Sequence, residues 1–414
     1  MQNDIIIELV VSHKIKSEVR TDVGTSMPEG VRLFAWVRAI RWFGWGFGES
    51  LLPIFILSFS HTFAEAGLFS STVEIVSLMS LPIIGTWADR VPAKRLVLWS
   101  LILYPFVGLG YLLAGIFGLA VFVVLARAVN GFTWELENVG VATYYRRVID
   151  KRSIAASFGY LDTWTNLAWI AAAIMGMFLI SFMPIHYLLF AIAPFSIVAY
   201  FIALKAPKDP MASDGEVKQP IIYSFGKSLK AWRTWKANFW LLGIIVFFSS
   251  IISAFTSFFI PITAYLAGAN LPMVVLLGIF GALPALFGYI LGRIADRRNR
   301  YILIALSLFC VAIIAVWLAA IHAYWLKLSA VFLLGIILEL LYVVQSSLIT
   351  TLGPAETFGR RGSAFESVST LGDLVAPLIL GVALDVLGFS NVTFVIGAVA
   401  IVLAVTFLLK RREA

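Results

Sequence analysis

The sequence predicts an all-α integral membrane protein of twelve transmembrane helices, arranged as two pseudo-symmetric six-helix bundles. Hydrophobic residues make up 61% of its 414 residues and charged residues only 13%, whereas soluble globular proteins carry about 25% charged residues. The apolar residues form long, nearly continuous runs, and about 20 of them cross the apolar core of a bilayer as a helix. Ten-residue alternation, the pattern of an outer-membrane barrel, is absent, so the spans are expected to be helices.

Twelve apolar runs are long enough to span a membrane. They cover residues 34–60, 65–86, 95–114, 118–145, 153–182, 184–204, 237–266, 271–291, 301–321, 325–352, 362–385 and 389–409. When both ends of the chain are placed in the cytoplasm, every Lys and Arg except Arg127 and Lys327 falls on the cytoplasmic side. Because cytoplasmic loops retain positive charge during insertion, we expect a multi-pass protein of the cell membrane with cytoplasmic N- and C-termini.

The longest polar segment between spans divides the chain into two halves. We expect a cytoplasmic N-terminal segment at 1–33, a six-helix bundle at 34–204, a cytoplasmic linker at 205–236, a second six-helix bundle at 237–409 and a cytoplasmic C-terminus at 410–414. The end of the linker mixes Lys and Arg with Trp232, Trp235 and Trp240. This mixture suits a helix that lies at the membrane interface, and a solvated linker with aromatic anchors fits equally well.

A repeat relates the two halves. At a fixed offset of 207 positions, Asp89 corresponds to Asp296 and Asn166 corresponds to Asp373. A duplicated six-helix unit explains this correspondence. Parallel repeats of this kind are typical of secondary transporters, whose binding site lies near the midplane where the halves meet.

Composition and motifs argue against other classes of protein. The bias of Lys and Arg toward the cytoplasm explains the net charge of +8, so we expect no nucleic acid partner. The segment "FGKS" at 225–228 lacks the first glycine of a phosphate loop, so we expect no nucleotide. Cys310 is the only cysteine, which excludes thiolate clusters, and neither a His/Asp metal cluster nor a Ser/His pair indicates an enzyme. We therefore expect neither metal nor cofactor. The expected partners are membrane lipid and a small-molecule substrate, and we expect the protein to be a monomer.

Two charged loops carry a resemblance to a known family. The loops "GTWADRVPAKR" at 85–95 and "GRIADRRNR" at 292–300 share Gly-x-x-x-Asp-Arg followed by basic residues. This pattern, between spans two and three and again between spans eight and nine, resembles the first signature of the major facilitator superfamily. "RAVNG" at 127–131 resembles the second signature, with Asn in place of Gln. The resemblance covers residues 32 to 409 and implies a transporter that works by alternating access.

The chain also departs from the family pattern. The glycine expected three residues after the aspartate is Pro92 in the first loop and Asn299 in the second. Asn tolerates the left-handed conformation of a tight turn and Pro does not, so the first loop is expected to turn differently. The span-five signature of drug/proton antiporters and the motifs of sugar porters are missing, so no subfamily is assigned.

The resemblance implies a gate at the cytoplasmic side. In the family, the aspartate of the loop meets the N-terminal end of span eleven and nearby arginines, and a helix N-terminus does favour a carboxylate. We expect Asp89 to have this role, and Asp296 to be its counterpart against the start of span five near Ser153. The expected gate residues are Gly85, Asp89, Arg90, Lys94, Arg95, Gly292, Asp296, Arg297 and Arg300, with Arg146, Arg147, Arg360 and Arg361 as ion partners. Alternatively, these loops only anchor the topology through positive charge.

Polar residues inside the spans indicate a central cavity. An ionisable residue in a span is costly unless it faces a wet or paired environment, and spans three, six, nine and twelve carry none in their interiors. In four other spans, polar and aromatic residues recur at helical spacing on one face. The residues expected to line a substrate cavity are Asn130, Trp134, Asn138, Asn166, Glu339, Tyr342 and Asp373. A packed core could account for any one of these faces.

Arg127 and the acids of the same half form the expected proton-coupling site. Glu49 and Glu74 are the preferred partners of Arg127, and Asp162 is the third candidate. Protonation would neutralise such an acid, lower the cost of moving it through a closed state, and so couple protons to the solute. Glu339 and Asp373 are better placed to attract a cationic or polar solute.

These observations lead to one functional expectation with two alternatives. We expect a secondary active transporter that moves a small-molecule substrate by alternating access, energised by the proton gradient, with efflux of organic or cationic compounds favoured over uptake. The first alternative is an uncoupled facilitator of a small polar metabolite, in which the acids only bind the substrate. A transporter-derived receptor is more distant, because no sizeable soluble domain is present.

Overall fold

The computed structural model describes residues 28–149, 154–208, 237–321, 323–351 and 358–410, and these residues form helices and connecting turns without a strand. Seven of the described helical stretches are long and apolar enough to cross a membrane by length and composition. The expected all-α membrane class is therefore confirmed.

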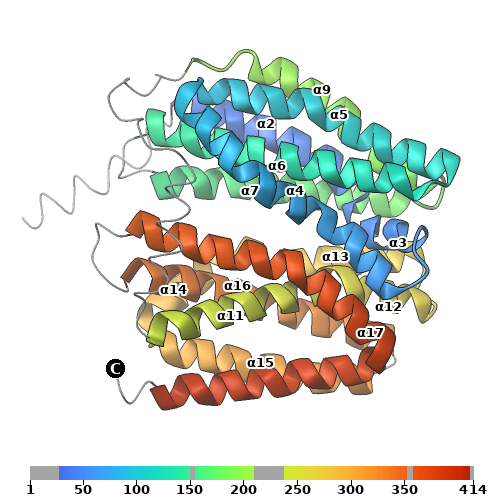
Figure 1. The fold of residues 1–414 in the computed structure, drawn as a ribbon, viewed down its shortest axis with the longest axis vertical. Coiled ribbons are helices and arrows are strands. Elements are labelled where there is room, and N and C mark those ends of the chain that lie inside the picture. Colours follow the sequence, from blue (N-terminus) through green and yellow to red (C-terminus); the bar gives the residue numbers. More distant parts are fainter. Residues whose placement is uncertain (1–27, 150–153, 209–236, 322, 352–357, 411–414) are drawn as a thin grey trace, which may run out of the picture.

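The first group of helices runs from Glu29 to Ala203. It comprises α2 (Glu29–Gly46), η1 (Glu49–Leu51), α3 (Leu52–Leu57), α4 (Phe63–Arg90), α5 (Ala93–Phe117), α6 (Ala120–Val148), α7 (Ile154–Leu179), α8 (Ile185–Phe190) and α9 (Ile192–Ala203). Figure 1 draws these helices together in its upper half, from blue to green. Within the group, α2 packs against α7 and α9, and α5 packs against α6 and α9.

The second group of helices runs from Ala237 to Lys410. It comprises α11 (Ala237–Ala254), η2 (Phe255–Phe259), α12 (Ile260–Leu266), α13 (Leu271–Ala282), η3 (Leu283–Phe287), α14 (Gly288–Arg297), α15 (Arg300–Ala320), α16 (Tyr324–Thr351) and α17 (Phe358–Lys410). These helices occupy the lower half of Figure 1, from yellow to red. The long α17 turns back at Gly388, which has φ 76° and ψ 166°. Only glycine adopts this conformation readily, and Gly388 falls between the spans expected at 362–385 and 389–409.

The two signature loops turn in the same way, contrary to the expectation. Pro92 precedes α5 with φ −55° and ψ 131°, and Asn299 precedes α15 with φ −68° and ψ 117°. Both residues are extended, so neither loop requires the left-handed conformation. The Asn299 side chain accepts hydrogen bonds from the backbone N–H groups of Tyr301 and Ile302, which is the usual role of Asn before a helix.

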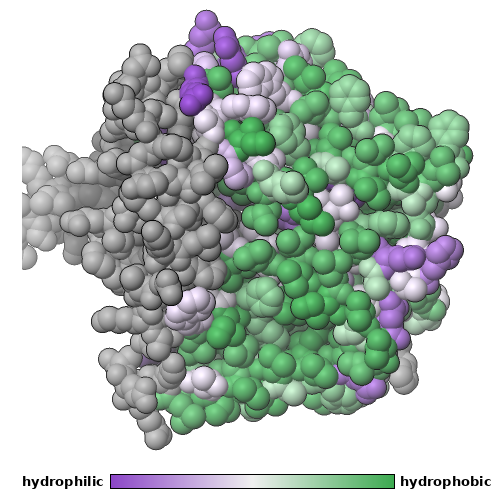
Figure 2. Space-filling model, in the orientation of Figure 1, coloured by the Kyte–Doolittle hydropathy of each residue, from purple (hydrophilic) through white to green (hydrophobic). Residues whose placement is uncertain are grey.

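The helices on the outside of each group present apolar faces. On α5 the exposed residues include Trp99, Ile102 and Phe106, and on α15 they include Leu306 and Phe309. Apolar residues cover most of the coloured face in Figure 2, and strongly hydrophilic residues lie toward its top and right margins. Such a surface is stable in contact with lipid, where an exposed apolar side chain costs no free energy.

The two groups meet along α4 and α17, with further contacts between α7 and α13 and between α3 and α12. Glycines permit the close approach of α4 and α17. A Cβ atom on Gly67 would overlap the carbonyl of Pro377, and one on Gly381 would overlap the backbone of Phe63 and Ala64. Small residues have this role at helix interfaces in membranes, because they let two backbones come close together.

Candidate functional site

A cavity of about 890 Å³ lies between the two groups of helices. This volume is within the usual range for sites that bind small molecules. Both groups contribute to its wall, through η1, α3, α4, α6 and α7 on one side and α11 to α13, α16 and α17 on the other. Its polar side chains are Glu49, Ser50, Ser70, Glu74, Arg127, Ser249, Ser250, Ser253, Thr256, Ser257, Glu339, Tyr342, Gln345, Ser346, Ser369 and Asp373.

Some of the residues expected from the sequence lie in the cavity wall, and others lie outside it. Those in the wall are Glu49, Glu74, Arg127, Glu339, Tyr342 and Asp373. Those outside the wall are Asn130, Trp134, Asn138, Asn166 and Asp162. Asn130 is buried, and Trp134 packs edge-on against Trp42 of α2. The helical stripe of α6 therefore divides between the cavity and the interior of the first group.

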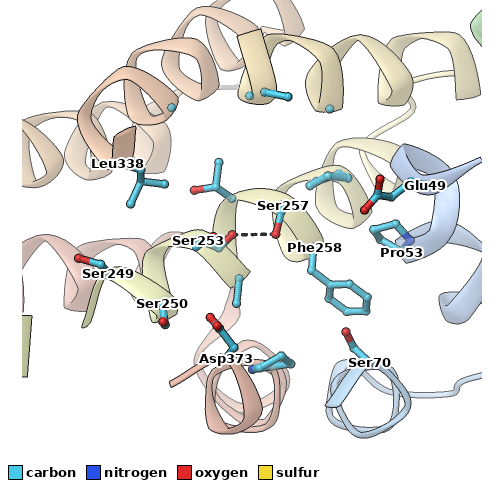
Figure 3. Close-up of a pocket in the computed structure, with 18 of the residues that line it drawn as sticks. Glu49, Pro53, Ser70, Ser249, Ser250, Ser253, Ser257, Phe258, Leu338 and Asp373 are labelled. Atoms are coloured by element: carbon cyan, nitrogen blue, oxygen red, sulfur yellow. Dashed lines mark hydrogen bonds between the residues drawn. The ribbon is translucent and has the colours of Figure 1, made fainter. Parts of the chain in front are cut away.

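Glu49 is placed in the cavity by a break between α2 and α3. The break begins after Gly46, and Pro53 near the start of α3 has no N–H to continue the preceding helix. The Glu49 carboxylate accepts a hydrogen bond from Nε1 of Trp169 on α7. Figure 3 shows the carboxylate extending from the chain beside Pro53. The acid is thus held in one orientation at the cavity surface.

Arg127 connects α6 to α4 at the cavity wall. Its side chain is 8% exposed, and Nη2 donates a hydrogen bond to the Ser70 carbonyl oxygen over 2.6 Å. Ser70 lies one helical turn before Glu74, so the guanidinium group is bound beside this acid. Gly131 lies one turn along α6 from Arg127, where a Cβ atom would overlap the Val73 carbonyl. The Arg and Gly of "RAVNG" therefore have complementary roles, since one bonds to α4 and the other lets α6 approach it.

A hydroxyl-rich wall from α11 and η2 faces these charged groups. Ser249, Ser253 and Ser257 recur every four residues and line the cavity, as one face of a helix does. Figure 3 shows their helix lying above the helices that bear Ser70 and Asp373, with Asp373 pointing toward it. The π-helical turn Phe255–Phe259 interrupts this helix. At the offset of 207, Thr256 corresponds to Glu49, so both groups break their first helix at the cavity.

A buried ion pair lies next to the cavity, inside the first group. Arg41 of α2 is 1% exposed and its Nε lies 2.8 Å from Oε2 of Glu137 on α6. Its guanidinium carbon lies 4.7 Å from the ring centroids of both Trp42 and Tyr104. Arg38 is a more distant partner, with Nε 3.9 Å from Oε1 of Glu137. Two residues earlier on α6, Glu135 faces α4 instead and accepts a hydrogen bond from Ser77.

Sequence reasoning missed this pair because it grouped Arg38 and Arg41 with the cytoplasmic basic residues. Both arginines nevertheless fall inside the expected span 34–60 and inside α2. Their position within a span, three residues apart and next to Trp42, is the signal that could have identified them.

Asp385 of α17 joins the two groups of helices at one end of the molecule. Its Oδ1 accepts a hydrogen bond from the Phe63 N–H over 2.9 Å, and its Oδ2 accepts one from the Ala64 N–H over 2.8 Å. These N–H groups begin α4, where a helix has free donors and partial positive charge. Ser71 then donates from Oγ to the Leu374 carbonyl over 2.8 Å. We call this the Asp385 end of the molecule, and the sequence had not singled out this aspartate.

At the opposite end, described residues of the signature loop bind within the first group. Arg147 donates from Nη2 to the Ala88 carbonyl at the end of α4 over 2.7 Å. Lys94 donates from Nζ to the carbonyls of Leu204, over 2.8 Å, and Ala206, at the end of α9. Both cations thus meet helix C-termini, where positive charge is favourable. Arg90, Arg95, Arg146 and Arg297 have exposed side chains.

The expected contacts of the two loop aspartates fall outside the described part of the chain. Asp89 lies near the end of α4 and Asp296 near the end of α14, but their side chains are not among those described. The same holds for the side chains of Arg360 and Arg361 and for residue Ser153. The gate remains a hypothesis on these residues.

Two groups of membrane helices with a polar cavity between them have the architecture of a membrane transporter. The model of the Major Facilitator Superfamily matches residues 34–372, and the chain belongs to this family. Its family and its structural neighbours are transporters and not enzymes. The expected resemblance is therefore confirmed, without assignment to a subfamily.

The chain is similar to known transporters in sequence and in structure. It is 21% identical over 349 residues to the Quinolone resistance protein NorA of Staphylococcus aureus, which covers 83% of this chain and 87% of that protein. A POT family transporter in complex with a thioalcohol-conjugated peptide matches with a TM-score of 0.76 at 13% identity, covering 93% and 96% of the two chains. A bacterial homologue of the human lysosomal transporter Spinster, inward-facing and occupied, matches with a TM-score of 0.73 at 13% identity, covering 92% and 96%.

Proposed function

We propose that the protein is a secondary active transporter that exports a small cationic solute across the cell membrane in exchange for protons. One observation carries this proposal. The cavity between the two groups of helices contains four acids, Glu49, Glu74, Glu339 and Asp373, and a single arginine among its described wall residues. Such a wall attracts cations, and both groups of helices take part in it.

The proposal includes the topology expected from the sequence. Twelve spans would form two six-helix bundles, at 34–204 and 237–409, with both termini in the cytoplasm and the protein acting as a monomer. In this topology the Asp385 end faces outward. The closed contacts there would make the described conformation inward-facing, a state in which the similar Spinster homologue was solved.

Proton coupling is proposed at Glu49, Glu74 and Arg127. Glu74 and Glu49 both line the cavity with Arg127, so each acid can bind either a proton or the charged group of a solute. Competition between the two would make release of the solute depend on proton entry, as an exchanger requires. The name of the NorA relative, a resistance protein, favours export over uptake.

Alternating access also requires the cytoplasmic end to close. We propose that Asp89 then binds the start of α17 near Arg360 and Arg361, and that Asp296 binds the start of α7. Arg147 already bonds to the Ala88 carbonyl, next to Asp89 in the chain, so it can hold the loop in position for this contact.

The proposal is tested by flux in proteoliposomes that contain a pH-sensitive dye. Addition of a transported cation should move protons in the opposite direction, and Glu74→Gln should abolish this proton movement. Glu65→Gln is the matched control, because its carboxylate accepts a hydrogen bond from the His61 N–H outside the cavity. Cation flux without proton movement in the unmodified protein would instead identify an uncoupled facilitator.

A further inference from the structure

Several hydrogen-bond donors of the cavity wall are directed into the protein. The hydroxyl groups of Ser249, Thr256 and Ser257 donate to carbonyls one turn earlier on their own helix, over 2.8 to 2.9 Å. A hydroxyl group carries one proton and two lone pairs. Each of these side chains therefore offers the cavity only an acceptor.

Three nitrogen groups of the wall also donate to protein acceptors. Nε1 of Trp169 donates to Glu49, and Nε2 of Gln345 donates to Oγ of Ser249 over 3.0 Å. Arg127, the one described cation of the wall, uses Nη2 to bind the Ser70 carbonyl. Because tryptophan has a single polar hydrogen, Trp169 has no further hydrogen bond to give a ligand.

The wall consequently combines negative charge with an excess of acceptor oxygens. Ionised carboxylates accept hydrogen bonds and donate none, and the acids lie in both groups of helices, with Glu49 and Glu74 in one and Asp373 and Glu339 in the other. A ligand that fits such a wall is cationic and rich in N–H donors. A quaternary ammonium ion carries the charge but has no N–H.

We propose that the transported solute carries at least two protonated primary or secondary amino groups, joined by an apolar spacer, and bridges the acids of the two groups of helices. This inference rests on the proposed function, because it takes the cavity as the transport site. The apolar wall residues, among them Ile56, Val246 and Leu338, would pack against the spacer. Each amino group would form charge-assisted hydrogen bonds, which are stronger than neutral ones.

Bridging also gives the solute a role in the conformational change. A ligand can shift an equilibrium between two conformations only through its different affinity for them. A diamine held by both groups binds best when they are close together, whereas a monoamine held by one group has no such preference. The diamine therefore favours the closed, occupied state through which transport must pass.

The test compares matched pairs of probes on the purified full-length protein. Calorimetry measures the affinity of each diamine from diaminobutane to diaminodecane for the protein. Each affinity is compared with that of the bis(trimethylammonium) ion of the same length. We expect the best diamine to bind at least about tenfold more tightly than its quaternary partner, since the latter forfeits every charge-assisted hydrogen bond. Equal or tighter binding of the quaternary ion would overturn the inference, because charge or aromatic faces would then be sufficient.

A second measurement tests the bridge. Asp373→Asn keeps the shape of the side chain and removes its charge. It should therefore weaken binding of the best diamine by about tenfold, and binding of the monoamine of the same length by less than about twofold. Glu65→Gln, outside the cavity, should change neither the affinity for the diamine nor that for the monoamine. Equal losses for diamine and monoamine would exclude the bridge.

Failure of this inference and failure of the proposed function give different results. If the quaternary ions bind tightly and are exchanged for protons in proteoliposomes, the exporter stands and the requirement for N–H donors falls. If no probe of either series moves protons, the exporter itself is contradicted.

Discussion

At the scale of single residues, the pair of Arg41 and Glu137 illustrates how charge is retained inside the first group. Both side chains are almost fully buried, at 1% and 2% exposed. Two aromatic rings face the guanidinium group, which adds cation–π attraction. A buried pair adds little stability compared with apolar residues of the same size, but loss of one partner leaves an uncompensated charge.

We therefore expect Glu137→Gln to lower the free energy of unfolding by about 3–5 kcal/mol. The measurement is thermal unfolding of the purified protein in detergent, with Glu65→Gln as the control outside the core. Replacing both partners, as Arg41→Leu with Glu137→Leu, should recover most of the lost Tm. If the double variant unfolds at the same temperature as Glu137→Gln, the buried charge is not the cause of the loss.

Gly131 provides a second prediction at this scale. Gly131→Ala places a methyl group against the Val73 carbonyl, and overpacking of this kind costs about 1–3 kcal/mol. Gly85 is the matched control, because it also lies within a helix but has open space around its Cβ direction. We expect Gly131→Ala to lower Tm and Gly85→Ala to leave it unchanged or raise it. The same small effect for both variants would contradict a close α4–α6 contact.

The residues of the site were predictable to different degrees. Glu49, Glu74 and Asp373 could be recognised because a charged residue in an apolar run is conspicuous. Arg41 was not recognised, since its positive charge near the chain start also fits a cytoplasmic segment. Asn166 and Asn138 have the spacing of cavity residues but lie outside the wall, because spacing fixes the face of a helix and not its rotation against neighbours.

At the scale of elements, the contact between α4 and α17 at the Asp385 end should control access from that end. Asp385→Ala removes both hydrogen bonds to the start of α4, so the contact should open more often. In a Cys310→Ser background with Ser70→Cys in the cavity wall, a membrane-impermeant thiol reagent added outside should react several-fold faster in the Asp385 variant.

Glu65→Ala is the matched control for this experiment. Its carboxylate also accepts a hydrogen bond at the start of α4, from His61, but this bond stays within the first group. The labelling rate should therefore remain that of the background. If Asp385→Ala leaves labelling unchanged, the aspartate does not hold this end closed.

The extent of most helices followed from the apolar runs, while their interruptions did not. The run at 65–86 lies within α4, and the run at 95–114 lies within α5. The span expected at 34–60 is instead divided into α2, η1 and α3 around Glu49. Hydropathy averages over such a break, because the residues on both sides are equally apolar.

At the scale of the whole molecule, transport should require the α4–α17 contact to open and close. We expect a disulfide between Ser71→Cys and Leu374→Cys to abolish flux, since these residues join the two groups of helices. Reduction should restore it. Flux in proteoliposomes, with Cys310 replaced by Ser, provides the measurement.

A cross-link inside one group serves as the control. Leu96→Cys and Leu136→Cys lie in one small cluster of the first group, and their disulfide should leave flux intact if the group moves as a rigid body. Loss of flux for both cross-links would contradict rigid-body motion of the groups.

The overall architecture was the most predictable level. The membrane class and the family followed from composition and from two copies of one loop pattern. The position of the cavity followed only in outline, because it depends on which faces of α4, α11 and α17 meet. That choice is made by contacts between backbones, such as those at Gly67 and Gly381, which leave no distinctive side chain in the sequence.

The partner of Asp385 is the peptide backbone, and this has a consequence for how the protein can change over time. An ion pair between two side chains can be inverted by exchanging the residues, and each partner restricts the other. Here the two hydrogen bonds place no demand on the side chains of residues 63 and 64 beyond excluding proline, because every other amino acid supplies the same N–H. A charge-swap experiment would accordingly fail at this position, and comparisons that search for co-varying residue pairs would not detect the closure.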